Sequence, residues 1–162
     1  MSTVSVPLTQ GKVALIDEAD YPLVAGYKWS LARRAHTDYA QTWARKEDRR
    51  LTCILMHRLL MGSPTAMLVD HRDRNGLNNT RANLRLATHS ENHCNSRSRL
   101  KNPTGYKGVS WDASKGMWRA QIRSGGVQYH IGRFEDPEEA ARAYDRQARV
   151  LHGDFARLNF PD

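Results

Sequence analysis

The chain contains only two cysteines, Cys53 and Cys94, among its 162 residues. Two cysteines provide neither a disulfide framework nor a Cys-x-x-Cys metal site, which fits a reducing compartment. Long apolar runs are also missing, since no stretch approaches the roughly 20 apolar residues of a membrane span. The first twelve residues, MSTVSVPLTQGK, lack the apolar segment of a signal peptide. We therefore expect a soluble, cytoplasmic protein without a membrane partner.

Acidic residues are in deficit. Lys and Arg number 25 against 17 Asp and Glu, a net charge of +8, which indicates a polyanionic partner. The excess is unevenly distributed: residues 97–133 hold eight basic residues and one acidic residue, whereas residues 134–162 hold four and seven. This segregation favours a contact surface in the basic part over a uniformly solvated one. The length allows one ordinary domain or two small ones.

The first 56 residues read as short strands separated by turn residues. Their large aromatic side chains, Tyr27, Trp29 and Trp43, are expected in a core, because small β-rich domains need large apolar groups. Basic residues near the strand ends are either solvated charges or phosphate contacts. The expected strands are 4–8, 12–16, 27–31, 39–45 and 51–56, and the basic residues are Arg33, Arg34, Lys46, Arg49 and Arg50.

Residues 57–95 contain several polar motifs in close succession. A short helix, HRLLM, is followed by the acidic-histidine pair Asp70-His71 and by the tight-turn signal Asn75-Gly76. Residues 83–87 alternate as a half-buried strand does, and a capping box of Thr88 and Glu91 then opens a helix with Asn92 in its first turn. Each motif alone is commonly structural, but their order and spacing favour a functional site.

This order of strand, loop, strand and helix resembles the ββα-metal fold of the HNH endonucleases, in particular their phage and intron-encoded, homing-type branch. The resemblance covers about residues 57–95. It implies that Asp70 and Asn92 each place one oxygen on a divalent cation, with His71 as the general base. Asn83 corresponds to the middle asparagine of the catalytic motif, which holds the loop. His57 is expected to pack beneath the site, and His93 is a rival of Asn92 as ligand.

The residue types suit phosphodiester hydrolysis. Mg²⁺ prefers oxygen ligands and keeps several waters, so we expect Mg²⁺ at such a site, with Mn²⁺ as the alternative. A neutral imidazole has the ordinary pKa closest to neutrality, as a general base requires.

A basic segment poor in apolar residues follows, and its composition is typical of a linker. Its Arg97, Arg99 and Lys101 could follow a phosphate backbone, although a solvated linker would carry the same charges. The predicted organisation is a nuclease domain at residues 1–96, a linker at 97–103 and a second domain at 104–162.

The second domain is predicted to be three antiparallel strands and one helix. The strands are expected at residues 106–111, 117–123 and 127–134, and a helix from Asp136-Pro137 to Gly153. Alternation along the strands predicts that Tyr129 and Ile131 face the helix. The residues predicted on the opposite face are Arg119, Gln121, Arg123, Gln128 and His130.

The segments YKGVSW, MWRAQIR, YHIGRF, EEAARAYD and LNFP, within Thr104–Pro161, resemble the DNA-binding domain of the plant ethylene-response-factor family. In that family the exposed sheet face lies in the DNA major groove, so the resemblance implies double-stranded DNA as partner. The residues it implies as contacts are Lys107, Arg119, Gln121, Arg123 and His130. Ser110, Asp112, Gln121 and His130 depart from the plant pattern, so the plant target sequence does not carry over.

The sequence thus predicts an α+β protein with a β-rich amino-terminal region, a ββα-metal unit and a three-stranded sheet on one helix. The expected function is a DNA endonuclease of a phage or bacterial host cell. A monomer or weak dimer is expected. A single site cuts one strand per encounter, so a monomer would nick, and double-strand cleavage would need a dimer or two encounters. The alternatives are a catalytically silent DNA-binding regulator and an RNA-directed nuclease, which a sheet that reads B-DNA disfavours.

Overall fold

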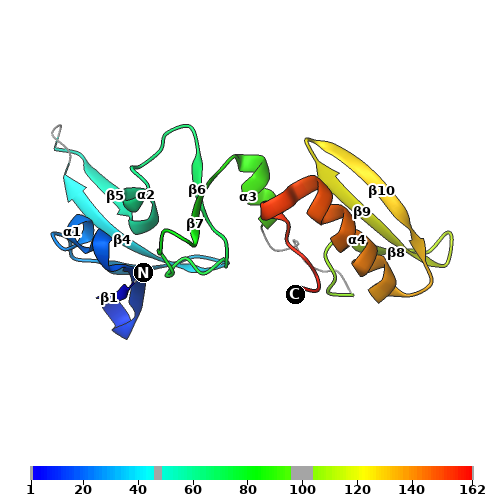
Figure 1. Ribbon diagram of the computed structural model, residues 1–162, viewed down its shortest axis with the longest axis horizontal. Helices are drawn as coiled ribbons and strands as arrows, with labels where there is room; N and C mark the ends of the chain where they lie inside the picture. Colours follow the sequence, from blue (N-terminus) through cyan, green and yellow to red (C-terminus); the bar gives the residue numbers. More distant parts are fainter. Residues whose placement is uncertain (1, 46–48, 96–103, 162) are drawn as a thin grey trace. The chain divides into compact units, whose positions relative to one another are not determined.

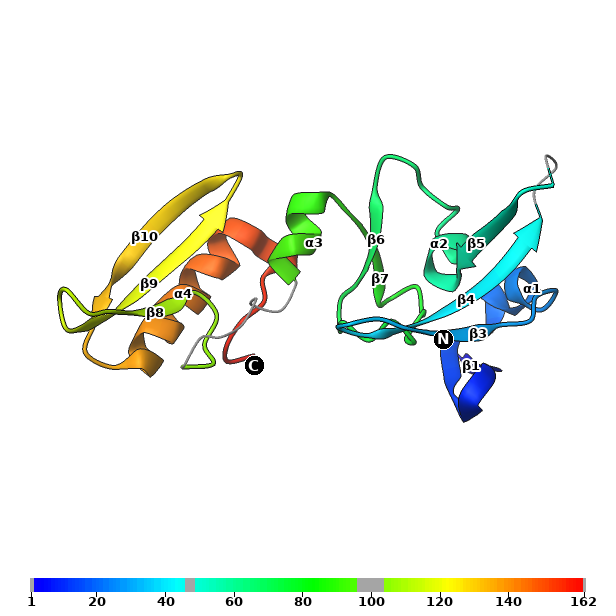
Figure 2. The ribbon, with the colours of Figure 1, turned by 180° about the vertical axis from the view of Figure 1, so that it is seen from behind.

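The computed structural model describes residues 2–45, 49–95 and 104–161. It divides into two compact units, residues 1–88 and 89–162, shown from opposite sides in Figures 1 and 2. Both units combine antiparallel sheets with helices, so the predicted α+β class is confirmed. Within the described residues no helix has the length and apolar character to cross a membrane.

Within its described residues, the first unit contains three small antiparallel sheets. The hairpin of β1 and β2 forms the first, the order β3-β4-β5 the second, and the pair β6-β7 the third. The strands are β1 Thr3–Pro7, β2 Val13–Asp17, β3 Ser30–Arg33, β4 Asp38–Arg45, β5 Leu51–Leu55, β6 Leu68–His71 and β7 Leu84–Ala87, and the helices are α1 Tyr21–Val24 and α2 Met56–Leu60.

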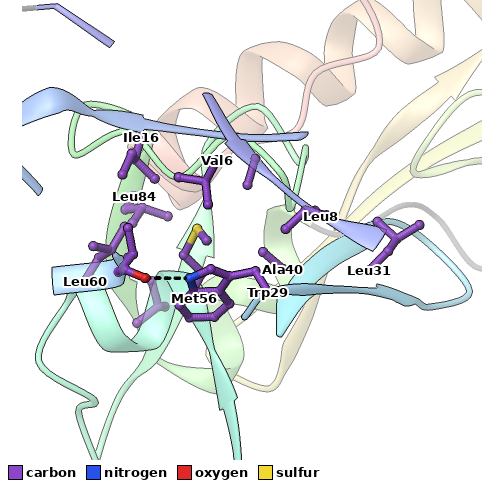
Figure 3. Packing of buried hydrophobic residues seen from close by; sticks show 12 residues of the cluster. Val6, Leu8, Ile16, Trp29, Leu31, Ala40, Met56, Leu60 and Leu84 are labelled. Atoms are coloured by element: carbon purple, nitrogen blue, oxygen red, sulfur yellow. Dashed lines mark hydrogen bonds between the residues drawn. The ribbon is translucent and has the colours of Figure 1, made fainter. Parts of the chain in front are cut away.

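The core of this unit joins the hairpin, the second sheet and α2 (Figure 3). Ile16, Val24 and Met56 are fully buried at its centre. The indole of Trp29 is also buried and donates a hydrogen bond of 3.0 Å to the carbonyl of Val24. This bond ties the residue to α1, so the strand expected from residue 27 begins only at Ser30.

Two of the aromatic residues expected in this core lie outside it. Trp43 is 55 % exposed, and Tyr27 is exposed as well. The buried residues of β4 are Ala40 and Thr42, so strand alternation places Trp43 on the opposite face of the sheet. Of the three predicted core aromatics, only Trp29 is therefore confirmed.

The second unit begins with α3 and continues as a sheet with a long helix across one face (Figure 2). Its elements are α3 His89–Asn95, β8 Val109–Asp112, β9 Met117–Ser124, β10 Val127–Phe134 and α4 Pro137–His152, with the strand order β10-β9-β8. The side chain of Asp136 accepts a hydrogen bond of 2.8 Å from the backbone N–H of Glu139. The predicted N-cap of this helix is thereby confirmed.

Small residues let α4 lie close to its sheet. Ala120 on β9 and Ala140 on α4 are fully buried in one cluster. Gly108 has a φ of +79°, and a Cβ there would lie 2.0 Å from the ring of Tyr144. Both the backbone conformation and the close approach require glycine at this position.

Candidate functional site

Asp70 lies on β6 directly opposite Arg85 on β7. Its Oδ2 accepts hydrogen bonds from Arg85 Nε at 2.9 Å and Nη2 at 2.7 Å, and both side chains are buried. A buried carboxylate is costly unless it is paired and hydrogen-bonded, and the guanidinium meets this requirement. The pairing fixes the orientation of the carboxylate that the sequence predicts as a metal ligand.

His71 follows on the same strand, and its ring orientation is set by Asn79. The two side chains meet at 3.2 Å between His71 Nε2 and Asn79 Oδ1. Asn79 is fully buried, and its Nδ2 donates to the carbonyl of Leu77 at 3.2 Å. Because a carbonyl can only accept, the amide oxygen must face the imidazole, which therefore donates from Nε2. This tautomer leaves Nδ1 as the basic nitrogen of His71.

Sequence reasoning missed Asn79. It lies in a run of turn residues, LNNT, where asparagine is ordinary. The feature that separates it from Asn78 is its complete burial beside a histidine, which the sequence does not express.

Two rings, those of His57 and Tyr39, pack against His71. The ring centroids of His57 and His71 are 4.9 Å apart in an edge-on arrangement, and Tyr39 lies 5.3 Å from His57 and 5.9 Å from His71. His57 is buried, and among the residues that the structure describes its Nδ1 has no hydrogen-bond partner. His57 therefore packs edge-on against His71, and its place beneath a metal site stays a prediction.

Burial sets the charge state of both histidines. Desolvation, followed by repulsion from His71 and Arg58, lowers the pKa of His57 to about 3. The pKa of His71 is also lowered, chiefly by burial, against the opposing effects of Asn79, Asp73 and Asp70. Both imidazoles are thus neutral at neutral pH, and a neutral His71 can accept a proton.

Asn83 lies in the turn before β7 and holds the loop after β6. Its Oδ1 accepts from the backbone N–H of Asp73 at 3.0 Å. Its Nδ2 donates to Asp73 Oδ1 at 2.9 Å and to the carbonyl of Asn78 at 2.7 Å. This is the loop-holding arrangement that the family resemblance implies; participation of Asn83 in catalysis stays a prediction.

The amino-terminal strands hold the same loop from the other side. The N–H of Leu15 donates to the carbonyl of Leu77 at 2.8 Å, and the N–H of Asn79 donates to the carbonyl of Leu15 at 2.7 Å. Arg81 adds paired hydrogen bonds of 2.8 and 2.9 Å to the carboxylate of Asp20. Gly76 also lies so close to the first residue of β4 that a Cβ at this position would be 2.3 Å from the backbone carbonyl oxygen of Asp38.

Asn92, the second predicted metal ligand, lies in α3 and therefore in the second unit, as does its rival His93. The shared coordination of one cation by Asp70 and Asn92 stays a prediction. In the part of the chain that the structure describes, no group of three or more His, Cys, Asp or Glu side chains could hold a metal ion.

The outer face of the second unit gathers the polar residues predicted on it. Ala120 and Ile122 of β9 are buried toward α4, so Arg119, Gln121 and Arg123 point the other way. On β10 the direct partner of Gln121 is His130, and that of Arg123 is Gln128. Gln128 Nε2 donates to Gln121 Oε1 at 2.6 Å.

Arg133 shares this face, although simple alternation would turn it toward the helix. The register of β10 against β9 shifts between His130 and Gly132, which places Arg133 opposite Arg119. Such a bulge reverses the inward and outward alternation beyond it. Arg133 Nε forms an ion pair of 3.1 Å with Asp112 Oδ2. The bulge therefore adds Arg133 to the outer face of the second unit, a position that the sequence did not predict for it.

The other predicted contacts have different positions. Lys107 precedes β8, and its ammonium donates a hydrogen bond to the backbone carbonyl of Cys94. Arg97, Arg99 and Lys101 of the predicted linker lie outside the described residues.

Comparisons with known proteins match both parts of the chain. Residues 55–94 match the model of a family described as HNH endonuclease, and residues 104–153 match that of the AP2 domain. An uncharacterized HNH endonuclease from Acanthamoeba polyphaga mimivirus is 29 % identical over 150 residues, covering 93 % of this chain and 76 % of the relative. Protein 3.8 of Escherichia phage T7 is 39 % identical over 95 residues, covering 59 % and 78 %. Dehydration-responsive element-binding protein 2C of Arabidopsis thaliana is 42 % identical over 59 residues, 35 % of this chain and 17 % of the relative.

Proposed function

Because the chain belongs to the HNH endonuclease family and carries an AP2 domain after its nuclease region, we propose that it is a metal-dependent enzyme that nicks duplex DNA. The observation that carries the proposal is the setting of His71, a buried neutral imidazole whose tautomer is fixed by Asn79. In the proposed reaction Nδ1 of His71 takes a proton from the water that attacks the scissile phosphorus. Asn79 is a positioning residue, since it acts through the imidazole.

The proposed metal ligands are Asp70 and Asn92. A carboxylate held by Arg85 and an amide oxygen are donors of the type that Mg²⁺ prefers, with Mn²⁺ as the alternative. When bound, the cation stabilises negative charge on the leaving oxygen. Arg85 keeps the carboxylate of Asp70 in one orientation, and Asn83 keeps the following loop in place.

The first test is plasmid relaxation. Supercoiled plasmid incubated with the protein and Mg²⁺ or Mn²⁺ is expected to become open circular, and EDTA is expected to stop the conversion because the reaction needs the cation. Agarose gels measure the fraction converted. Plasmid that stays supercoiled with every divalent metal, together with tight binding in a gel-shift assay, would contradict the nuclease and favour the DNA-binding regulator.

The AP2 sheet is proposed to supply affinity for duplex DNA through Arg119, Gln121, Arg123 and His130. Replacing Arg119 and Arg123 together by alanine is expected to weaken binding, because the variant loses two proposed contacts to phosphate. Each lost phosphate contact should also reduce the magnitude of the slope of log K against log salt by about 0.9. Fluorescence anisotropy at several salt concentrations measures that slope. Arg146→Ala is the matched control, since this exposed arginine lies on α4, across the sheet from the outer face. An unchanged slope in the double variant would remove the sheet from the interface.

The biological setting proposed is that of a homing-type or accessory nuclease of a phage, acting as a monomer or weak dimer. The match to a protein of phage T7 supports this setting. A monomer with one catalytic histidine would cut one strand at each encounter. A double-strand break would need a dimer or two separate encounters.

A further inference from the structure

The outward face of the β3-β4-β5 sheet carries large side chains that the core does not use. Trp43 is 55 % exposed and Leu51 is 61 % exposed. Direct cross-strand pairs join Trp43 to Cys53 and Arg45 to Leu51. We call this surface the β4 face; its members are Tyr39, Gln41, Trp43 and Arg45 of β4 and Leu51, Cys53 and Leu55 of β5.

The β4 face begins at the catalytic histidine. Tyr39, its first member, packs against His71 and His57 with centroid distances of 5.9 and 5.3 Å. The members on β4 then follow at every second residue to Arg45. Six residues of strand extend about 20 Å, which is close to the rise of six base pairs. A duplex with its scissile bond at His71 could therefore follow the face over about half a turn.

The chemistry of the face favours a polyanion. Residues 30–55 hold six basic residues, five of them arginines, against three acidic ones. Of these arginines, strand alternation places Arg45 on the β4 face. The exposed side chain of Arg45 stands at the outer end of β4, and Gln41 lies between the aromatic residues with its Oε1 3.5 Å from Cys53 Sγ. Indole, amide and guanidinium together suit the sugars and phosphates of a nucleic acid backbone. A purely apolar protein partner would not use this arginine excess.

We propose that the β4 face binds the stretch of duplex DNA flanking the cleaved bond, with Trp43 against the sugars and Arg45 on a phosphate. The proposal rests on the proposed nuclease function and adds to it a second DNA-contacting surface, separate from the AP2 sheet. It also accounts for a large aromatic residue left in solvent on a sheet whose other face is buried.

Binding is tested in the full chain carrying His71→Ala, so that the duplex is not cleaved. The probe is a short labelled duplex of mixed sequence, followed by fluorescence anisotropy. Trp43→Ala is expected to raise Kd about tenfold, as truncation of an aromatic anchor does, without changing the salt slope. Arg45→Ala is expected to lower the slope by about 0.9, the value of one phosphate contact. Leu23→Ala is the matched control, because Leu23 is 49 % exposed on α1 of the same unit.

A photoreactive phenylalanine analogue in place of Trp43 provides the direct readout. It is expected to crosslink to the duplex, whereas the same analogue in place of Leu23 is not. Unchanged Kd in Trp43→Ala and no crosslink at position 43, while the protein with His71 intact still nicks plasmid, would overturn the β4 face and leave the nuclease proposal standing. Failure of the unsubstituted protein to bind or nick DNA would instead overturn the nuclease proposal. A loss of self-association in Trp43→Ala, measured by sedimentation with unchanged DNA affinity, would assign the face to a second copy of the chain and overturn the proposal.

Discussion

Replacing His71 with alanine is expected to lower the rate of plasmid nicking by about 10²- to 10⁴-fold, the usual contribution of a general base. The variant loses the nitrogen proposed to take the proton from the attacking water, while Asp70 and Arg85 keep their ion pair. Single-turnover nicking with Mg²⁺ in excess measures the rate. Duplex affinity should stay within about twofold, because the base contributes to the transition state and little to ground-state binding.

The control for this substitution is Leu86→Ala, which removes an exposed side chain from β7 of the same ββα unit. It should leave the rate unchanged. An equal loss of rate in both variants, or an unaffected His71→Ala enzyme, would exclude His71 as the base.

The variant Asn79→Asp tests whether Asn79 positions the imidazole of His71 or only supports the fold. In Asn79→Asp an acceptor oxygen stays next to His71, but a carboxylate favours the imidazolium and raises the pKa of the base. The acid limb of the pH–rate profile should therefore move to higher pH, which a simple loss of stability would not cause. A reduced rate with an unmoved profile would argue that Asn79 only supports the fold.

The second large effect is a loss of stability of the first unit at acidic pH. His57 has a pKa of about 3 in the folded protein because it is buried, against an ordinary value of 6.5. Between these values the unfolded chain binds a proton that the folded chain does not, so the stability of the first unit falls as the pH falls. The slope is about 1.4 kcal/mol per pH unit for one histidine. His71 adds to the loss in the same direction, because its pKa is also lowered.

His57→Phe should remove one histidine's share of this slope, since the aromatic ring stays and no proton is taken up. Urea unfolding between pH 7 and 4 measures the free energy of unfolding at each pH. Leu23→Ala, which removes an exposed side chain of the same unit that binds no proton, should keep the wild-type slope. Parallel curves for wild type and His57→Phe would show that His57 is not held neutral by the fold.

Local signals predicted much of the fold. The N-cap at Asp136, the strand at residues 127–134 and the helix after Thr88 all depend on a few neighbouring residues, and the structure has each of them. The helix α1 escaped prediction because its four residues include a proline and show no apolar period. Trp43 was misplaced because aromatic content alone does not say which face of a strand packs on the core.

The candidate site divides in the same way. Asp70, His71 and Asn83 could be found from their motif, since adjacent residues and turns are visible in a sequence. Their partners could not: Arg85 and Asn79 take their roles from pairing across the hairpin and from burial. Arg133 reaches the outer face only through a bulge, and its one local signal is Gly132, because a glycine inside a strand pattern suggests a bulge that simple alternation does not include.

The loop that contains Asn79 depends on Leu15, Asp17 and Asp20, which limits how short a nuclease fragment can be when it is fused to another protein. Its backbone partners stand more than sixty positions earlier in the chain, where the N–H of Arg81 also bonds Asp17 at 2.7 Å. A peptide cut to residues 55–94, the stretch that matches the HNH endonuclease model, would leave Asn79 and Arg81 without these anchors and would therefore weaken the support behind His71. A fusion of this nuclease unit to another DNA-binding domain must therefore include residues 1–54 as well as residues 55–94.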